Sequence, residues 1–172
     1  MIYLNKSLER KLVYAPEFRA AGEAQDLKLT DKQIQALVRL LGDGRTITLD
    51  LVVNKIKEKK EQAIPVLTGI LRDYSNYTED THLAAIDILR EIGYRSKDAE
   101  KILCEILEEK PSERTSRAVY ALERIGTKDS LPALHKALEN LEAAKKEMIT
   151  QYYIEVQESI SDAIEVVLDK TF

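Results

Sequence analysis

The sequence predicts an all-α protein made of stacked helix pairs. Composition is the first reason: of 172 residues only six are Gly, four Pro and two Phe, none is Trp, and 33% are charged. This balance favours helices over sheets and over disorder. The second reason is an internal repeat of about 34 residues, whose apolar positions follow the 3.6-residue period of a helix. An apolar content of 44% is enough for one domain with a buried core.

The repeat is clearest in its last two copies. Residues 84–93 align with residues 117–126 at an offset of 33, and each stretch ends in a glycine. Beyond the glycine the offset falls to 31, so that residues 98–107 align with residues 129–138. The aligned pairs include Ala85 with Ala118, Leu89 with Leu122, Gly93 with Gly126, Asp98 with Asp129 and Leu103 with Leu134. Two helices therefore repeat, and the turn between them varies by two residues.

A third, earlier helix pair is predicted from residues 46–71. Residues 64–71 align with residues 131–138 at an offset of 67, or about two repeats. The helix before them, within 46–59, has helical apolar spacing but no glycine after it. Its apolar positions are Leu49, Val52, Val53 and Ile56. Because one helix pair cannot bury both of its apolar faces, we expect three stacked pairs with covered ends.

The two flanks are predicted to cover the ends of this stack within a single domain of residues 1–172. Residues 1–45 would form an N-terminal capping region, residues 46–141 the repeats, and residues 142–172 a long C-terminal capping helix. The N-terminal region is expected to hold a short helix over Leu4, Leu8 and Leu12 and a second helix over 31–41. Predicted helix caps are Thr30 (with Gln33 in a capping box), Thr78 and Ser112 at N-termini, and Gly93 and Gly126 at C-termini.

Apolar residues along the C-terminal helix step by four and three residues, which is a heptad pattern. Such a pattern is typical of a coiled-coil seam, which would join two copies of the chain through Ile149, Tyr153, Val156, Ile160 and Val167. A helix that caps the stack explains the pattern as well, because Tyr152, Ile164 and Leu168 widen the apolar stripe beyond a narrow seam. We favour the capping helix and expect a monomer, or a homodimer joined through this helix.

The residues that catalysis and metal binding need are scarce. Cys104 is the only cysteine, and the only histidines, His82 and His135, are 53 residues apart. They form neither a nucleophilic triad nor a metal-ligand spacing, so both histidines are predicted on helix surfaces and Cys104 as a half-buried packing residue. Residues 42–46 lack the Lys-Ser/Thr of a phosphate loop and predict a plain turn. We expect no catalytic, cofactor-binding or metal-binding residue, and we favour a protein that is not an enzyme.

Charge and hydropathy limit the partners and the cellular compartment that the sequence predicts. The net charge is −4; residues 1–86 carry 13 basic and 12 acidic side chains, and residues 87–172 carry 13 and 18. Since a nucleic-acid-binding protein normally has a basic excess, no nucleic-acid partner is expected. The chain starts without the apolar segment of a signal peptide, and its longest uncharged run, 62–71, is ten residues, so no membrane span is expected. With a single cysteine, these features predict a cytoplasmic protein.

The repeats resemble the HEAT family, and within it the short HEAT-like units of phycobilisome-lyase-type proteins. The resemblance covers about residues 46–141 and rests on three segments. They are the helix end A-[VI]-x-x-L-x-x-I-G at 85–93 and 118–126, the aspartates Asp98 and Asp129 that follow, and L-P-A-L-x-x-A-L at 131–138, echoed by I-P-V-L-x-x-I-L at 64–71. The resemblance implies a right-handed α-solenoid (α-α superhelix) of about three to four HEAT-like helix pairs with capping helices at both ends. Tetratricopeptide repeats have a similar period, but their Trp, Leu-Gly and Tyr signature is absent.

The resemblance also implies where a partner would bind, because in HEAT-like stacks the second helices line the concave side. There the repeat register forms a ridge from Thr68, Arg72, Cys104, Glu105, Glu108, His135, Lys136, Glu139 and Asn140. The favoured function is a non-enzymatic protein-protein interaction scaffold or adaptor whose ridge grips a helix or a basic segment of a protein partner. A plain solvated face is the alternative interpretation of the ridge. The alternative function, implied by the family alone, is a bilin or tetrapyrrole lyase or chaperone subunit.

Overall fold

The computed structural model describes residues 30–44, 49–145 and 150–170. These residues form helices and no strand, which confirms the all-α prediction. The long helices are α3 (Asp31–Gly42), α4 (Leu49–Ile56), α5 (Lys60–Arg72), α6 (Glu79–Ile92), α7 (Lys97–Leu107), α8 (Glu113–Ile125), α9 (Leu131–Ala144) and α10 (Thr150–Asp169), and two short 3-10 helices are η1 (Lys57–Lys59) and η2 (Lys128–Ser130). The helix predicted over Leu4, Leu8 and Leu12 and the residue Ile149 lie outside the described residues.

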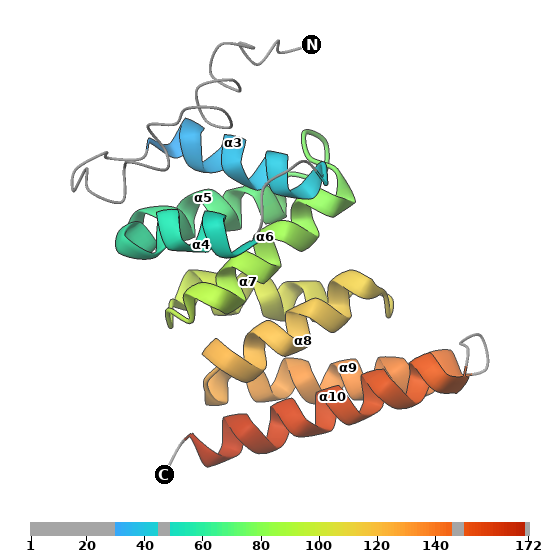
Figure 1. Cartoon of the computed structure of the whole chain (residues 1–172). Coiled ribbons are helices and arrows are strands. Elements are labelled where there is room, and N and C mark those ends of the chain that lie inside the picture. Colours follow the sequence, from blue (N-terminus) through green and yellow to red (C-terminus); the bar gives the residue numbers. More distant parts are fainter. Residues whose placement is uncertain (1–29, 45–48, 146–149, 171–172) are drawn as a thin grey trace.

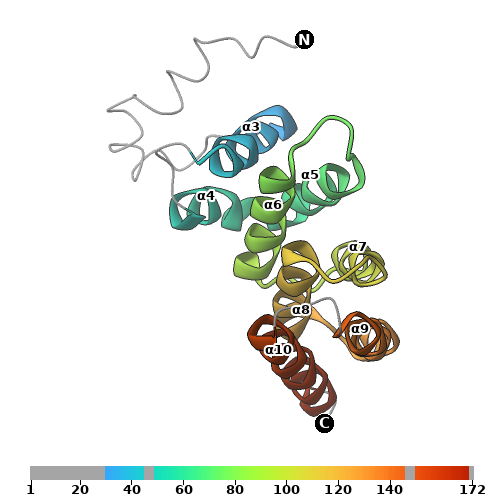
Figure 2. The same ribbon diagram turned by 90° about the vertical axis from the view of Figure 1, so that its right-hand side faces the viewer.

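The helices stack in two layers (Figures 1 and 2). Helices α6, α8 and α10 pack in order in one layer, and α5, α7 and α9 pack in order in the other. Between the layers, each second helix packs against the first helix of the following pair: α5 against α6, α7 against α8, and α9 against α10. This arrangement is that of a helical repeat protein; the right-handed sense of the solenoid stays a prediction.

The aligned repeat positions form one continuous core. Leu89 and Leu122 are both fully buried, and so are the aligned residues Leu103 and Leu134 of the second helices. The small residues Ala85 and Ala118 are also fully buried. The positions that the repeat aligns are therefore buried alike in successive repeats.

The predicted N-caps are confirmed. The side chains of Thr30, Thr78 and Ser112 each accept a hydrogen bond from the backbone N–H three residues later, and Thr30 and Ser112 form complete capping boxes. These bonds satisfy donors that a helix N-terminus would otherwise leave unpaired. The described helix α3 begins right after Thr30, as predicted.

The two aligned glycines end their helices, but for different physical reasons. Gly93 is left-handed, with φ 61°, the backbone conformation that favours glycine at a C-cap. Gly126 has an extended backbone, with φ −63° and ψ 155°. It is needed for space instead, because a Cβ there would lie 2.5 Å from the Leu122 carbonyl oxygen and 2.8 Å from the Ser130 Oγ.

We expect Gly126→Ala to lower the free energy of unfolding by about 1–3 kcal/mol, the usual cost of overpacking a buried site. Gly69→Ala is the matched control, because a Cβ at this position inside α5 meets nothing within 4 Å. It should stabilise the protein by about 0.5–1 kcal/mol through helix propensity. Urea unfolding followed by circular dichroism measures both, and equal effects of the two substitutions would contradict the steric explanation.

Both ends of the stack are covered by additional helices. At the N-terminal end, α3 packs against both α5 and α6, and α4 packs against α6. At the C-terminal end, α10 packs against α8 and α9. Helix α9 continues to Ala144, beyond the boundary predicted at residue 141.

The heptad residues of α10 face the interior of their own chain. Tyr153, Val156, Ile160 and Val167 are all buried in the common core with α8 and α9. A seam between two copies through these residues would require α10 to leave the stack. The capping interpretation of the heptad pattern accounts for this packing, because an apolar stripe that contacts α8 and α9 together is wide rather than narrow. Self-association through α10 stays a prediction.

Candidate functional site

The second-helix surface, meaning the solvent-facing sides of α5, α7 and α9, holds most of the predicted ridge. Six of the nine residues are exposed: Arg72, Glu105, Glu108, His135, Lys136 and Glu139. Cys104 and Asn140 are half-buried. Thr68 is buried, and its hydroxyl donates to the Pro65 carbonyl oxygen at 3.2 Å. This bond within the helix lets a polar residue enter the core, so Thr68 is not part of the surface.

Carboxylates gather around Cys104 in the middle of this surface. Burial raises the pKa of the Cys104 thiol to about 12, and the negative charges of Glu100, Glu105, Glu108 and Asp129 add to the effect. A thiol with such a pKa stays protonated at neutral pH and is a poor nucleophile. The interpretation of Cys104 as a half-buried packing residue is confirmed.

Toward α9 the charges are locally compensated. The Lys136 Nζ lies 2.9 Å from a carboxylate oxygen of Glu139, and this hydrogen bond lowers the pKa of Glu139. In α7, the Lys101 Nζ lies 3.9 Å from Glu105. Such exposed pairs contribute little to stability. The second-helix surface thus combines an acidic centre on α7 with ion pairs at its sides.

A buried carboxylate fixes the relation between α7 and α9. Glu100 is 7% exposed and accepts hydrogen bonds from the Thr127 N–H at 2.7 Å and the Thr127 hydroxyl at 2.9 Å. Thr127 in turn accepts a bond from the Asp129 N–H. One repeat earlier, the Tyr94 hydroxyl donates to Glu61. In each case a glutamate of one second helix accepts a hydrogen bond from the turn that leads into the next second helix.

A polar cluster with a buried centre lies where α5, α6, α7 and α8 meet. We call His82, Arg114, Tyr74 and Glu109 the Arg114 cluster; His82 and Arg114 are buried, whereas Tyr74 is 59% exposed. The Arg114 guanidinium donates to the Leu71 carbonyl oxygen at 3.0 Å and lies 3.1 Å from the His82 Nδ1. Because a guanidinium only donates, Nδ1 is the acceptor, and the proton of the ring is on Nε2, which donates to the Asp73 carbonyl oxygen at 3.4 Å.

The prediction that His82 lies on a helix surface is wrong, since this residue is 2% exposed. Both of its ring nitrogens are hydrogen-bonded, which is the condition for burying a histidine. Its other neighbours are the rings of Tyr74, in an edge-on contact with centroids 5.1 Å apart, and Tyr77. The prediction for His135 is confirmed, because its side chain is exposed.

Arg114 is only 4% exposed. Its guanidinium lies over the Tyr74 ring, 4.2 Å from the centroid, and its Nη2 is 3.8 Å from a Glu109 carboxylate oxygen. The carbonyl that it contacts is at the C-terminal end of α5, which attracts cations. Its Nε is the one buried side-chain donor of the described residues without a hydrogen-bond partner.

The Arg114 cluster is suited to holding helices together rather than to catalysis. The Tyr74 hydroxyl donates to Glu109, and burial together with this bond raises the pKa of Tyr74 to about 12. Burial and the charge of Arg114 lower the pKa of His82, so its ring stays neutral. A histidine with both nitrogens engaged has no free position for a general base.

The sequence contained one signal for this cluster. At the repeat offset of 33, Arg114 aligns with Thr81, and both residues stand in the first turn of a first helix. Both are buried, at 4% and 2% exposure. A charged residue at a position that the repeat buries is a candidate for a buried polar contact.

The His82 ring should make stability depend on pH. The unfolded chain binds a proton at His82 near pH 6.5, whereas the folded chain resists it because its pKa is lowered. The stabilisation is therefore complete above about pH 6.5 and is lost as the pH falls toward the folded pKa. In urea unfolding, we expect the free-energy difference between the native chain and His82→Gln to shrink as the pH falls from 7.5 to 5. His135→Gln, at an exposed histidine, should show no such trend; a flat difference for His82→Gln would contradict the prediction.

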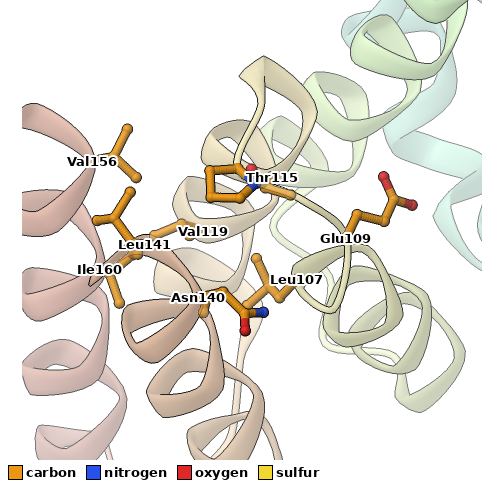
Figure 3. A pocket seen from close by; sticks show the side chains of 10 residues that line it. Leu107, Glu109, Thr115, Val119, Asn140, Leu141, Val156 and Ile160 are labelled. Atoms are coloured by element: carbon orange, nitrogen blue, oxygen red, sulfur yellow. The ribbon is translucent and has the colours of Figure 1, made fainter. Parts of the chain in front are cut away.

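A small apolar hollow lies between the end of α7 and helices α8, α9 and α10 (Figure 3). Its walls include Leu107, Val119, Leu141, Val156 and Ile160. The volume is about 10 Å³, which is room for one water molecule. A tetrapyrrole cannot enter a hollow of this size.

No group of three or more His, Cys, Asp or Glu side chains in the described part of the chain is placed to bind a metal ion. None of the helices in residues 30–44, 49–145 and 150–170 has the length and apolar character needed to cross a membrane.

The layered helix pairs place this chain among the helical repeat proteins. Residues 116–140, most of α8 and α9, match the family described as PBS lyase HEAT-like repeat. This match confirms the predicted resemblance to HEAT-like repeats. No curated protein and no solved structure shows a significant match to the chain.

Proposed function

We propose that the protein is a non-enzymatic scaffold that binds a protein partner through its second-helix surface. The observation that carries the proposal is the continuous layer of α5, α7 and α9, which turns charged residues of successive repeats to one side of the molecule. Helix α6, by contrast, is mostly buried between its neighbours. The second helices therefore offer a continuous surface that a partner can reach, and HEAT-like repeats often mediate protein interactions.

The charge on this surface defines the kind of partner. Glu105 on α7 and Glu108, the residue that follows α7, are exposed beside the half-buried Cys104 and near Asp129. Opposite charges across an interface guide association and reject wrong partners. The partner that fits best is a basic helix or segment of another protein. A single cysteine suits a reducing compartment, and we propose that the protein acts in the cytoplasm.

The test compares two charge-reversal variants of equal net charge. One, the α7 variant, carries Glu105→Lys on α7 and Glu108→Lys at its C-terminal cap; the control carries Glu158→Lys and Glu165→Lys, exposed residues of α10 in the other layer. Each tagged chain is used to capture proteins from a lysate of the native host, and quantitative mass spectrometry compares the two. We expect at least one protein whose recovery falls about tenfold with the α7 variant and not with the control. Proteins that are retained or lost equally by both variants would overturn the proposal.

The alternative of a bilin or tetrapyrrole lyase or chaperone subunit has no support beyond the words of the family description. The hollow in Figure 3 is too small for such a molecule. A bilin added to the pure chain should keep its absorbance spectrum, and a shifted spectrum would favour this alternative over the scaffold.

A further inference from the structure

A second, independent surface feature lies in the other layer. An open hollow of about 390 Å³ is lined by Arg90 of α6, by Tyr120, Glu123 and Arg124 of α8, and by Lys170, which follows α10. Figure 1 shows that α6, α8 and α10 all run toward the same edge of the stack, so their C-terminal ends bring these residues together. We call this hollow the Arg124 hollow. It shares no residue with the second-helix surface.

Positive charge is concentrated here although the whole chain has a net charge of −4. The hollow is lined by the cations Arg90, Arg124 and Lys170. The pKa of Lys170 is lowered, first by burial and second by the nearby positive charge of Arg95. The nearby carboxylates are Glu91 and Glu123. Of the charged residues that line the hollow itself, three are cations and one, Glu123, is a carboxylate.

The hydrogen bonds leave part of this donor capacity available. Arg90 and Arg124 share one carboxylate, with the Arg90 Nη2 at 3.2 Å and the Arg124 Nη1 at 3.5 Å from different oxygens of Glu91. The Arg90 Nε also donates to Glu91, at 3.2 Å. The two arginine side chains are 33% and 52% exposed, so solvent reaches both of them. The Lys170 ammonium donates to the carbonyl oxygens of Glu123 and Arg124, which end α8, and it has a third N–H.

We infer that the Arg124 hollow binds a phosphate group, either free or carried on a phosphorylated side chain. A phosphate carries a charge of about −1.5 to −2 at neutral pH and three acceptor oxygens, so it can contact two guanidinium groups and an ammonium at once. A carboxylate has only one charge and two oxygens, and the two arginines already share the carboxylate of Glu91. Planar guanidinium donors are the groups best suited to phosphate oxygens.

The test is a calorimetric and NMR titration of the full chain with two probes. The first probe is inorganic phosphate, and the second is a short phosphoserine peptide beside its unphosphorylated form. Arg90→Gln with Arg124→Gln should weaken binding about tenfold or more, since each charge-assisted bond is lost. The matched control is Arg72→Gln with Lys136→Gln, which removes two exposed cations from the second-helix surface and should leave binding unchanged.

A second variant keeps the test informative if the double variant folds poorly. Glu123→Gln removes a negative charge from the wall of the hollow and leaves all of its cations in place, so it should tighten phosphate binding several-fold. Circular dichroism checks the fold of each chain.

The results of the two titrations distinguish the sources of the phosphate group, and they can also overturn the inference. Equal binding of both probes identifies a free phosphate compound as the ligand class, and binding of the phosphopeptide alone identifies a phosphorylated protein segment; both support the inference. No binding of either probe, or an equal loss in the Arg72 and Lys136 control, would overturn it. The cations would then serve only to neutralise the C-terminal ends of α6 and α8. Because the two surfaces share no residue, failure here leaves the scaffold proposal untouched.

Discussion

Replacing Ile160 with glutamate is expected to lower the free energy of unfolding by about 4 kcal/mol or more. Ile160 is 2% exposed and lines the hollow between α8, α9 and α10. The substitution loses the burial of a large apolar side chain and places a carboxylate where apolar side chains surround it. Urea unfolding followed by circular dichroism measures the effect.

The matched control is Ile154→Glu on the same helix. Ile154 is 40% exposed, so this change should cost less than about 1 kcal/mol. The unfolding midpoint of Ile160→Glu should also be independent of protein concentration, because the lost contacts are within one chain. If Ile160→Glu instead gave a stable protein with half the mass of the native protein, the native protein would be a dimer joined through the coiled-coil seam of α10.

Replacing Arg114 with alanine is the second large effect, and we expect it to cost about 3 kcal/mol. The change leaves the Leu71 carbonyl oxygen and the His82 Nδ1 without the donor they now share, and it removes a side chain that fills the space beside Tyr74. Arg114→Lys should recover only part of the loss, because one ammonium cannot reproduce the planar fork that reaches both acceptors.

Arg117→Ala is the control for this experiment. Arg117 lies one turn further along α8, is 32% exposed and pairs with Asp87 and Glu113. Ion pairs that solvent still reaches contribute about 1 kcal/mol, and neither Asp87 nor Glu113 is left fully buried without its partner, so the loss should be smaller. An Arg114→Ala chain as stable as Arg117→Ala would show that the Arg114 cluster does not hold the helices together.

The second-helix surface and the Arg124 hollow have opposite charges, and their binding is tested by separate experiments. The second-helix surface is acidic around α7 and is proposed to take a basic protein segment, whereas the Arg124 hollow is cationic and is inferred to take a phosphate group. Both depend on stacking, since each gathers residues from more than one repeat.

The helices and their limits could be predicted from the sequence because their determinants are local. The N-caps Thr30, Thr78 and Ser112 act within three residues, and the apolar period that aligns Leu89 with Leu122 is visible in any one repeat. The same period predicted that the repeats stack, because no single pair can bury its faces.

What only the tertiary structure decided depends on groups far apart in the chain. His82 is buried because Arg114 and the Asp73 carbonyl satisfy its two nitrogens, and Arg114 reaches a carbonyl 43 residues earlier. Likewise Lys170 meets the end of α8, 46 residues before it, and thereby completes the Arg124 hollow. The heptad of α10 is compatible with a partner helix from a second copy or from its own chain, and the packing on α8 and α9 selects the latter. A periodic pattern records which face of a helix is apolar, whereas the identity of the surface that covers it is set by the assembled stack.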